Sequence, residues 1–415
     1  MAKQRNIFRK ILMGLAAVGP GLFLIGYNIG TGSVTTMAKS GAEYGMTLFW
    51  ALVLSCVFTY VLMVAYGQVT LVSGRTALAN FRSNLRFGSA LSIYIMIAMI
   101  LGELLALMGI MGIVGDLLQE GTRLLFGGKG VDAFWLILIC VIGLLALLWY
   151  GRYQVFEKAL TFFVILMALC FILELFLLRP DPGAILAGLV PSIPDEPGAF
   201  GLVAAMAGTT CSAAVFIMRS IVVAEKGWTI KNLAGEKRDA LVSASMMLLL
   251  SGVILAVAAG TLHVMGLKLD NTIDMVRLFE PIGGTFAALI LIIGVTGAGL
   301  SSAFPIILIA PWLISDYTGR PRDIRSPFYR VLGVVGLLFA FGSQFLSQRP
   351  PALMIFSQAF QACILPAVVV PIFLLINSQK LMGKHRAGLK MNIGLAAVLA
   401  FSVVTTYFAV AELMR

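Results

Sequence analysis

The fold of this chain is decided by two stretches, GPGLFLIGYNIGTGSVTTM at residues 19–37 and AMAGTTCSAAVFIM at residues 205–218. Each is an apolar run that small and polar residues interrupt near its middle, at 30–33 in the first and at 208–212 in the second. Irregular backbone at membrane depth is tolerated where it lines a cavity or is buried in protein. Paired broken helices are typical of transporters whose substrates bind at the breaks. The alternative is that these glycines only allow close helix packing, as Gly102, Ala106 and Gly109 do in a later run.

The composition places the chain in a membrane. Of its 415 residues, 60% are hydrophobic and 12% are charged, and the mean hydropathy is +0.99. Soluble domains are about 45–50% apolar and about 25% charged. We therefore exclude a soluble enzyme, a nucleic-acid-binding protein and a disordered scaffold.

Eleven apolar stretches are long enough to cross a hydrocarbon core of about 30 Å. The breaks fall in the first and the sixth of them, which predicts an inverted repeat of five plus five helices. We expect an all-α integral membrane protein with its first half at 1–178 (helices 1–5), its second half at 179–377 (helices 6–10), and a cytoplasmic loop and extra helix at 378–415. The expected spans lie at about 10–44, 46–73, 88–115, 132–149, 156–178, 198–222, 239–265, 284–314, 327–348, 352–377 and 391–412.

The net charge of +11 reports orientation in the membrane. The segments on the side of the N-terminus hold 22 of the 30 Lys and Arg residues, whereas the opposite side holds 8 basic and 11 acidic residues. Positive residues concentrate in cytoplasmic loops. We therefore expect a cell-membrane protein with a cytoplasmic N-terminus and an extracytoplasmic C-terminus, whose partners are lipid and the transported species and not nucleic acid.

The cysteines and histidines indicate neither a disulfide framework nor a metal cluster. His263 and His385 are far apart, and each cysteine lies inside an apolar run (Cys56, Cys140, Cys170, Cys211, Cys363). A zinc site would need closely spaced ligands. We expect no cofactor.

Several long stretches resemble the NRAMP family of divalent-metal transporters. They are GPG at 19–21 with SGAEYGMTLFW at 40–50, RYQVFEKAL at 152–160, ELFLLRPDPGAILAGLVPSIP at 174–194, and SQAFQACILPAVVVPIFLL at 357–375 followed by SQKLMG at 378–383. The resemblance covers nearly the whole chain. It implies the leucine-transporter fold and transport by alternating access.

The ligand positions of that family are changed here. Its Asp-Pro-Gly-Asn motif in helix 1 is matched by residues 30–33, and its Met-Pro-His motif in helix 6 by Ser212-Ala213-Ala214. A further family histidine is matched by Arg219. The other departures are Ile110 and Ile113 for two acids of helix 3, Leu300 for a Gln of helix 8 and Ile364 for a second Gln of helix 10, while Glu103 and Ser357-Gln358 are kept.

The remaining polar groups at the breaks are mostly neutral oxygens, so Glu103 carries special weight. Ionisable groups inside a membrane are rare and mark substrate or proton pathways; the alternative is a protonated carboxyl that only bridges helices. We expect a metal to contact Ser33, Ser212 and Glu103. The wider pathway is expected to include Asn28, Gly30, Thr31, Gly32, Thr209, Cys211 and Gln358. Arg219 either lines the cytoplasmic exit as a gate or extends to the membrane surface.

The leading hypothesis is secondary transport of a divalent cation, such as magnesium, that stays largely hydrated. Removing all water from a divalent ion among neutral ligands is costly, and magnesium keeps several waters in many protein sites. Manganese selection and proton coupling are expected to be weak or absent, because the family's methionine, acids and histidines are replaced. The first alternative is a carrier of an amino or carboxylic acid bound by backbone amides at 30–33; the second is a sensor that does not transport.

Overall fold

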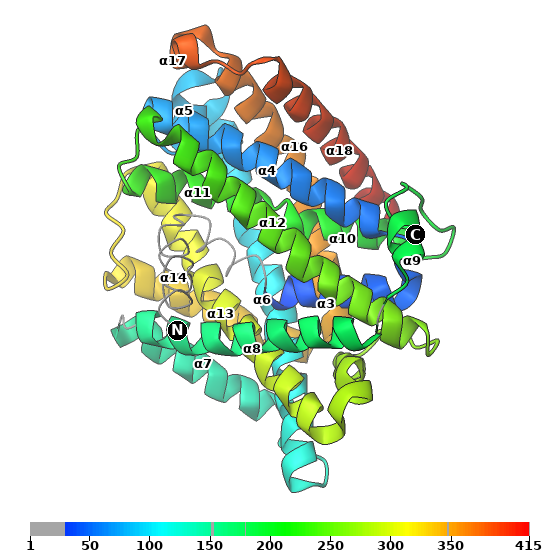
Figure 1. Cartoon of the computed structure of the whole chain (residues 1–415). Helices are drawn as coiled ribbons and strands as arrows, with labels where there is room; N and C mark the ends of the chain where they lie inside the picture. The colour runs from blue at the N-terminus through cyan, green and yellow to red at the C-terminus, as the bar shows by residue number, and fades with distance from the viewer. Residues whose placement is uncertain (1–29, 151–152, 179, 347, 415) are drawn as a thin grey trace, which may run out of the picture.

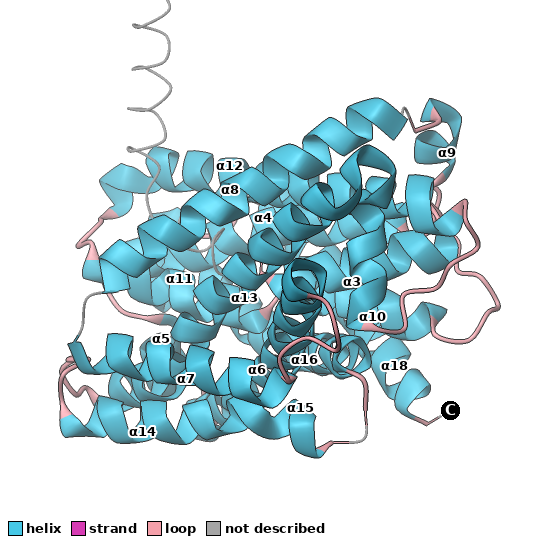
Figure 2. Cartoon of the chain, turned by 90° about the horizontal axis from the view of Figure 1, so that it is seen from below, coloured by secondary structure: helices cyan, strands magenta, loops and turns pink. Residues whose placement is uncertain are grey.

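The computed structural model describes residues 30–150, 153–178, 180–346 and 348–414. Every regular element within these residues is a helix, so the all-α prediction is confirmed for them (Figures 1 and 2). The long helices are α4 (Phe49–Ser73), α6 (Gly88–Phe126), α7 (Ala133–Tyr150), α8 (Tyr153–Leu178), α12 (Leu233–Ala258), α13 (Glu280–Thr318), α16 (Pro350–Asn377) and α18 (Leu389–Leu413). The shorter ones are α3 (Thr31–Tyr44), α5 (Ala77–Asn84), α9 (Pro182–Ala187), α10 (Ala199–Thr210), α11 (Ala213–Glu225), α14 (Pro327–Leu338), α15 (Gly342–Phe345) and α17 (Gln379–Met382).

Nine helical segments of the described chain are long and apolar enough to cross a membrane. They fall on nine of the eleven predicted spans. Of the other two, the first is described only from residue 30, and the fifth, α8, carries a shorter apolar segment at Ile165–Leu178. The count of eleven stays a prediction.

The helices extend beyond several predicted ends. The predicted span 88–115 is part of α6, which runs on through the polar residues to Phe126, and α12 begins at Leu233, six residues before its predicted start. Hydropathy detects only the part of a helix that lies in hydrocarbon. Backbone hydrogen bonding continues into polar residues outside it.

The predicted span 198–222 is two helices. The break consists of Cys211 and Ser212, which separate α10 from α11. It is shorter than the predicted 208–212, because residues 208–210 continue the helical hydrogen bonding of α10. The Ser212 Oγ accepts a hydrogen bond from the backbone N–H of Ala214 at 3.3 Å, so it caps the start of α11. At the other predicted break, residues 30–33, helix α3 begins at Thr31, directly after Gly30, whose backbone is extended.

Close packing of α16 against both breaks explains two of the glycines. A Cβ at Gly208 would overlap the backbone carbonyl oxygen of Gln358, and a Cβ at Gly32 would overlap the Met354 methyl group. The same helix α16 packs on α6 and α10, and α6 packs on α13. Close packing therefore accounts for both glycines, because each lets α16 come near a break.

Candidate functional site

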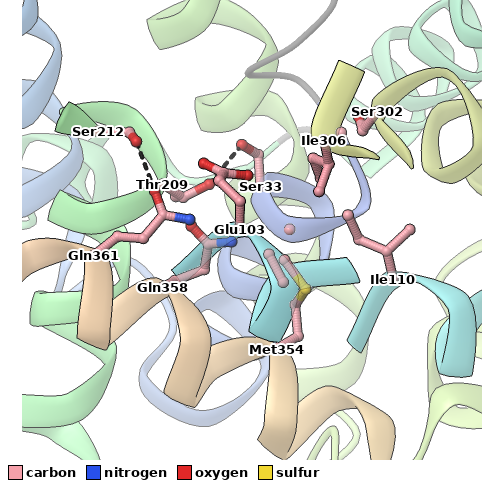
Figure 3. Close-up of a pocket in the computed structure, with 13 residues that line it drawn as sticks. Ser33, Glu103, Ile110, Thr209, Ser212, Ser302, Ile306, Met354, Gln358 and Gln361 are labelled. Carbon is pink, nitrogen blue, oxygen red and sulfur yellow. Dashed lines mark hydrogen bonds between the residues drawn. The ribbon is translucent and has the colours of Figure 1, made fainter. Parts of the chain in front are cut away.

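A pocket lies where the two breaks meet α6, α13 and α16 (Figure 3). Its lining includes the start of α3, the end of α10 and the start of α11. The lining residues are Gly30, Gly32, Ser33, Glu103, Ala106, Ile110, Thr209, Ser212, Ser302, Ile306, Met354, Gln358 and Gln361.

Two hydrogen bonds tie the breaks together and to α16. The hydroxyls of Ser33 and Thr209 are 2.9 Å apart, which links α3 to α10. The Ser212 hydroxyl donates to Oε1 of Gln361 at 2.6 Å, which links the start of α11 to α16. The pocket is therefore framed by polar groups whose positions are fixed by hydrogen bonds.

Glu103 is the acidic residue of this lining. It is 4% exposed and comes from the middle of α6, and its carboxylate lies beside Ser33, Thr209 and the Gln358 amide in Figure 3. The N-termini of α3 and α11 also meet at the pocket. Helix N-termini carry a partial positive charge and helix C-termini a partial negative one, and the C-terminal end of α10 also reaches the pocket at Thr209.

The cavity has a volume of about 40 Å³. On this scale one water molecule needs about 10–15 Å³, so the pocket has room for about three.

Of the ten predicted pathway residues, the structure brings together seven, places two elsewhere and does not describe one. Gly30, Gly32, Ser33, Glu103, Thr209, Ser212 and Gln358 line the pocket. Thr31 instead donates its hydroxyl hydrogen to the Val295 carbonyl of α13 at 3.4 Å. Cys211 is fully buried in an apolar cluster away from the pocket lining. Asn28 lies outside the described residues.

Arg219 also lies away from the pocket. Its guanidinium is fully buried and pairs with Glu236 at 2.7 Å and with Asp239 at 2.9 Å, both on α12. The expectation that it extends to the membrane surface is therefore wrong, because two acids on the next helix provide its partners inside the protein. Its role as a gate stays a prediction.

Sequence reasoning missed Gln361, Met354 and Ser302. Met354, Gln358 and Gln361 are spaced four and three residues apart, so they share one face of α16. Because Gln358 was predicted to line the pathway, this helical spacing also predicts that Met354 and Gln361 face it. Met354 also places a thioether in the lining, although the position on α11 that carries sulfur in the family holds Ser212 here.

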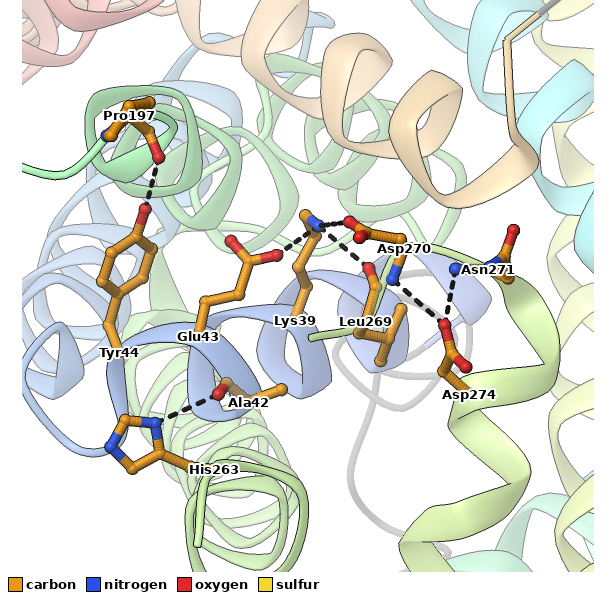
Figure 4. A network of polar contacts seen from close by, with 10 residues as sticks. All are labelled: Lys39, Ala42, Glu43, Tyr44, Pro197, His263, Leu269, Asp270, Asn271 and Asp274. Carbon is orange, nitrogen blue, oxygen red and sulfur yellow. Dashed lines mark hydrogen bonds and ion pairs between the residues drawn. The ribbon is translucent and has the colours of Figure 1, made fainter. Parts of the chain in front are cut away.

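The C-terminal half of α3 forms a second polar network (Figure 4). Lys39 pairs with Glu43, donates to the Leu269 carbonyl at 2.9 Å and pairs with Asp270 at 3.4 Å. The His263 ring contacts the Ala42 carbonyl at 3.1 Å. These contacts attach α3 to the segment that connects α12 to α13.

A group of three or more His, Cys, Asp or Glu side chains that could hold a metal is not found within the described ranges. In the pocket lining, a metal would find one carboxylate, hydroxyl, amide and backbone oxygens, and the Met354 thioether.

The sequence profile of the family described as Natural resistance-associated macrophage protein-like (Nramp) matches residues 21–412. The chain belongs to the Nramp family. The resemblance found in the sequence is confirmed.

Two curated Nramp relatives are each named divalent metal cation transporter MntH. The one from Ralstonia nicotianae is 26% identical over 399 residues, covering 90% of this chain and 86% of the relative; the one from Nostoc sp. is 25% identical over 402 residues, covering 91% and 86%.

Solved structures share the fold of this Nramp chain. A mutant of the Eremococcus coleocola manganese transporter matches with a TM-score of 0.71 at 16% identity, covering 96% of this chain and 86% of that one. MhsT in complex with L-phenylalanine matches with a TM-score of 0.65 at 14% identity, covering 95% and 98%. At these identities the likeness concerns the fold alone.

Proposed function

We propose that this Nramp-family chain carries a divalent metal cation across the cell membrane by alternating access. The observation that carries the proposal is the single buried carboxylate of Glu103 among neutral oxygen donors at the point where the two breaks meet. Oxygen ligands suit hard cations such as magnesium, calcium and manganese. The names of the curated relatives support the same class of substrate.

The ion is bound with part of its water. Ser33, Thr209, Ser212 and two glutamine side chains offer neutral oxygens, and one carboxylate balances only half of a divalent charge. Retained water lowers the cost of binding such an ion in a buried site. The cavity of about 40 Å³ has room for a few water molecules beside the ion, which supports binding with part of its water.

Selection of manganese over magnesium or calcium is expected to be weak. Met354 supplies a sulfur atom, but its methyl group packs at Gly32 and its sulfur packs at Gly109. We interpret it as a packing residue, so Met354→Leu should leave the ratio of manganese to magnesium uptake unchanged. A manganese preference that disappears in this variant would contradict that interpretation.

Proton coupling of the family's usual kind is not expected. Two positions of α6 that are acidic in the family hold Ile110 and Ile113, and Ile110 lines the pocket. A pH-sensitive dye inside vesicles should record no proton flux in fixed ratio to metal uptake. A stoichiometric proton current would contradict this.

An organic solute is the second candidate. The N-termini of α3 and α11 at the pocket suit a carboxylate. Glu103 already places a carboxylate there, and the cavity holds only a few water-sized groups. Both observations favour the cation.

The orientation with a cytoplasmic N-terminus, the total of eleven spans and the inverted repeat belong to the same proposal. They rest on the positive-inside distribution of charge and on the paired breaks. Cysteine labelling from either side of the membrane at loop positions 129 and 384 tests the orientation, with residue 129 expected outside and residue 384 inside.

The deciding experiment is uptake of manganese, magnesium and calcium into vesicles that contain the purified protein. Saturable uptake is expected, and Glu103→Gln should reduce it at least tenfold, because the substitution removes the negative charge and keeps the shape. Glu120→Gln is the matched control: it lies on the same helix, outside the pocket, in a pair with Arg123. Folded protein that takes up none of these ions would overturn the proposal, and competition by amino or carboxylic acids would then be tested.

A further inference from the structure

A strongly basic segment connects α16 to α18. It reads SQKLMGKHRAGLK at residues 378–390, with four Lys or Arg side chains and no acid. None of these four forms an ion pair with a residue that the structure describes. Unpaired cations also occur in other basic loops, for example at Lys231, Lys237 and Arg325, whereas Arg322 pairs with Glu225 and Asp316. Positive charge alone therefore does not mark this segment, and the inference rests on the cavity that it borders.

The segment borders an open polar cavity of about 480 Å³. Its lining residues are Asn377, Gly383, Lys384, Arg386, Ala387 and Asn392. The two asparagines come from α16 and α18 and are joined by a 2.8 Å hydrogen bond from Nδ2 of Asn377 to Oδ1 of Asn392. The cavity is thus bounded by two long helices and by a loop that carries two cations.

Hydrogen bonds hold the loop in place over the helix ends. The Ala387 backbone N–H donates to the Ile376 carbonyl at 3.2 Å. The Gln68 side chain of α4 donates to the His385 carbonyl at 2.8 Å. Two different helices therefore fix the loop that bears Lys384 and Arg386, which indicates a built site and not a random coil of charge.

The helices that bound the cavity expose large apolar side chains near it. Leu374 on α16 is 58% exposed, and Leu389 and Ile393 on α18 are 77% and 61% exposed. Only 33% of the apolar window of α18 is buried in the protein. In a chain that crosses a membrane, such side chains face lipid. Cations, a polar cavity and a lipid-facing apolar surface therefore lie together at one corner of the bundle.

We propose that this cavity binds the phosphate group of an anionic phospholipid. The guanidinium of Arg386 offers a planar pair of donors that matches a phosphate, and Lys384 adds a second charge. Basic pockets between membrane-spanning helices bind such headgroups. The acyl chains lie along Leu374 and Ile393. The proposal does not depend on which substrate the central pocket carries.

The test measures the melting temperature of the purified full chain in detergent as phosphatidylglycerol is added. A ligand that binds the folded state raises the melting temperature. The wild type should be stabilised by phosphatidylglycerol and not by phosphatidylcholine. In the double variant Lys384→Gln with Arg386→Gln, the lipid concentration for half of the effect should rise about thirtyfold, since each cation contributes to anionic-lipid attraction.

The matched control is Lys231→Gln with Lys237→Gln, which removes two exposed cations from another basic loop that does not line the cavity. It should respond to the lipid as the wild type does. Equal responses of the two double variants would overturn the proposal, and so would the absence of any shift in the wild type. A shift of the same size with inorganic phosphate or glycerol phosphate would assign the cavity to a free anion instead.

Discussion

The two half-helices that begin at the breaks, α3 and α11, each carry one cation about two turns from the pocket, and the two cations have opposite surroundings. Lys39 on α3 is 17% exposed and pairs with Glu43 and Asp270, which are 12% and 54% exposed. Arg219 on α11 is 0% exposed, and its partners Glu236 and Asp239 are 0% and 4% exposed. We call the contacts of Lys39 the outer network and those of Arg219 the inner network. The outer network is partly exposed, whereas the inner network is buried inside the protein.

This difference in exposure predicts that separating the ion pairs of Lys39 costs less free energy than separating those of Arg219. Exposed ion pairs contribute little because water replaces them on separation. A buried guanidinium has no such replacement, and removing its partners leaves an uncompensated charge. We expect α11 to stay fixed to α12, while α3 can part from the segment at 269–274 during transport.

The largest effect is expected for Arg219→Leu. It leaves two carboxylates buried side by side, so the free energy of unfolding should fall by about 3–5 kcal/mol. Denaturation in mixed micelles measures this, with the exposed Arg325→Leu as control. A loss no greater than that of the control would mean that the inner network is open to water.

A smaller loss is expected for Glu236→Gln. The amide oxygen still accepts from Arg219, and Asp239 remains to balance the guanidinium. One charge-assisted hydrogen bond is weakened, so about 1.5–3 kcal/mol is expected. The same denaturation assay applies, and a loss as large as that of Arg219→Leu would show that Asp239 alone cannot compensate the cation.

The smallest effect is expected for Lys39→Gln. Asp270 is exposed, but Lys39 and Glu43 are only 17% and 12% exposed, so the loss should be about 1 kcal/mol, the upper end for an exposed pair. The difference from the wild type should shrink further at 1 M salt, where the screening length is about 3 Å. Denaturation at low and high salt measures this. A loss of stability that salt does not reduce would mean that the outer network is shielded from solvent ions, as the inner network is.

Much of the site was predictable because the signals are local. The breaks at 30–33 and 208–212 are recognisable in the sequence as small and polar residues inside apolar runs. Glu103 is recognisable as a carboxyl group inside another apolar run. Cys211 shows the limit of such signals. It adjoins Ser212, which lines the pocket, but its own side chain is buried in an apolar cluster. Adjacent residues at a break point in different directions, and sequence does not say which one faces the pocket.

The sequence by itself determined the membrane class, the family, nine apolar helices among the residues that the structure describes, and the approximate position of the break between α10 and α11. These follow from hydropathy and residue type, which act within one segment of chain. Only the tertiary structure decided that Met354 and Gln361 join the pocket and that Arg219 is buried with α12. The physical reason is that a helix presents several faces to its surroundings, and the helices packed around it determine which face meets water, lipid or a charged partner.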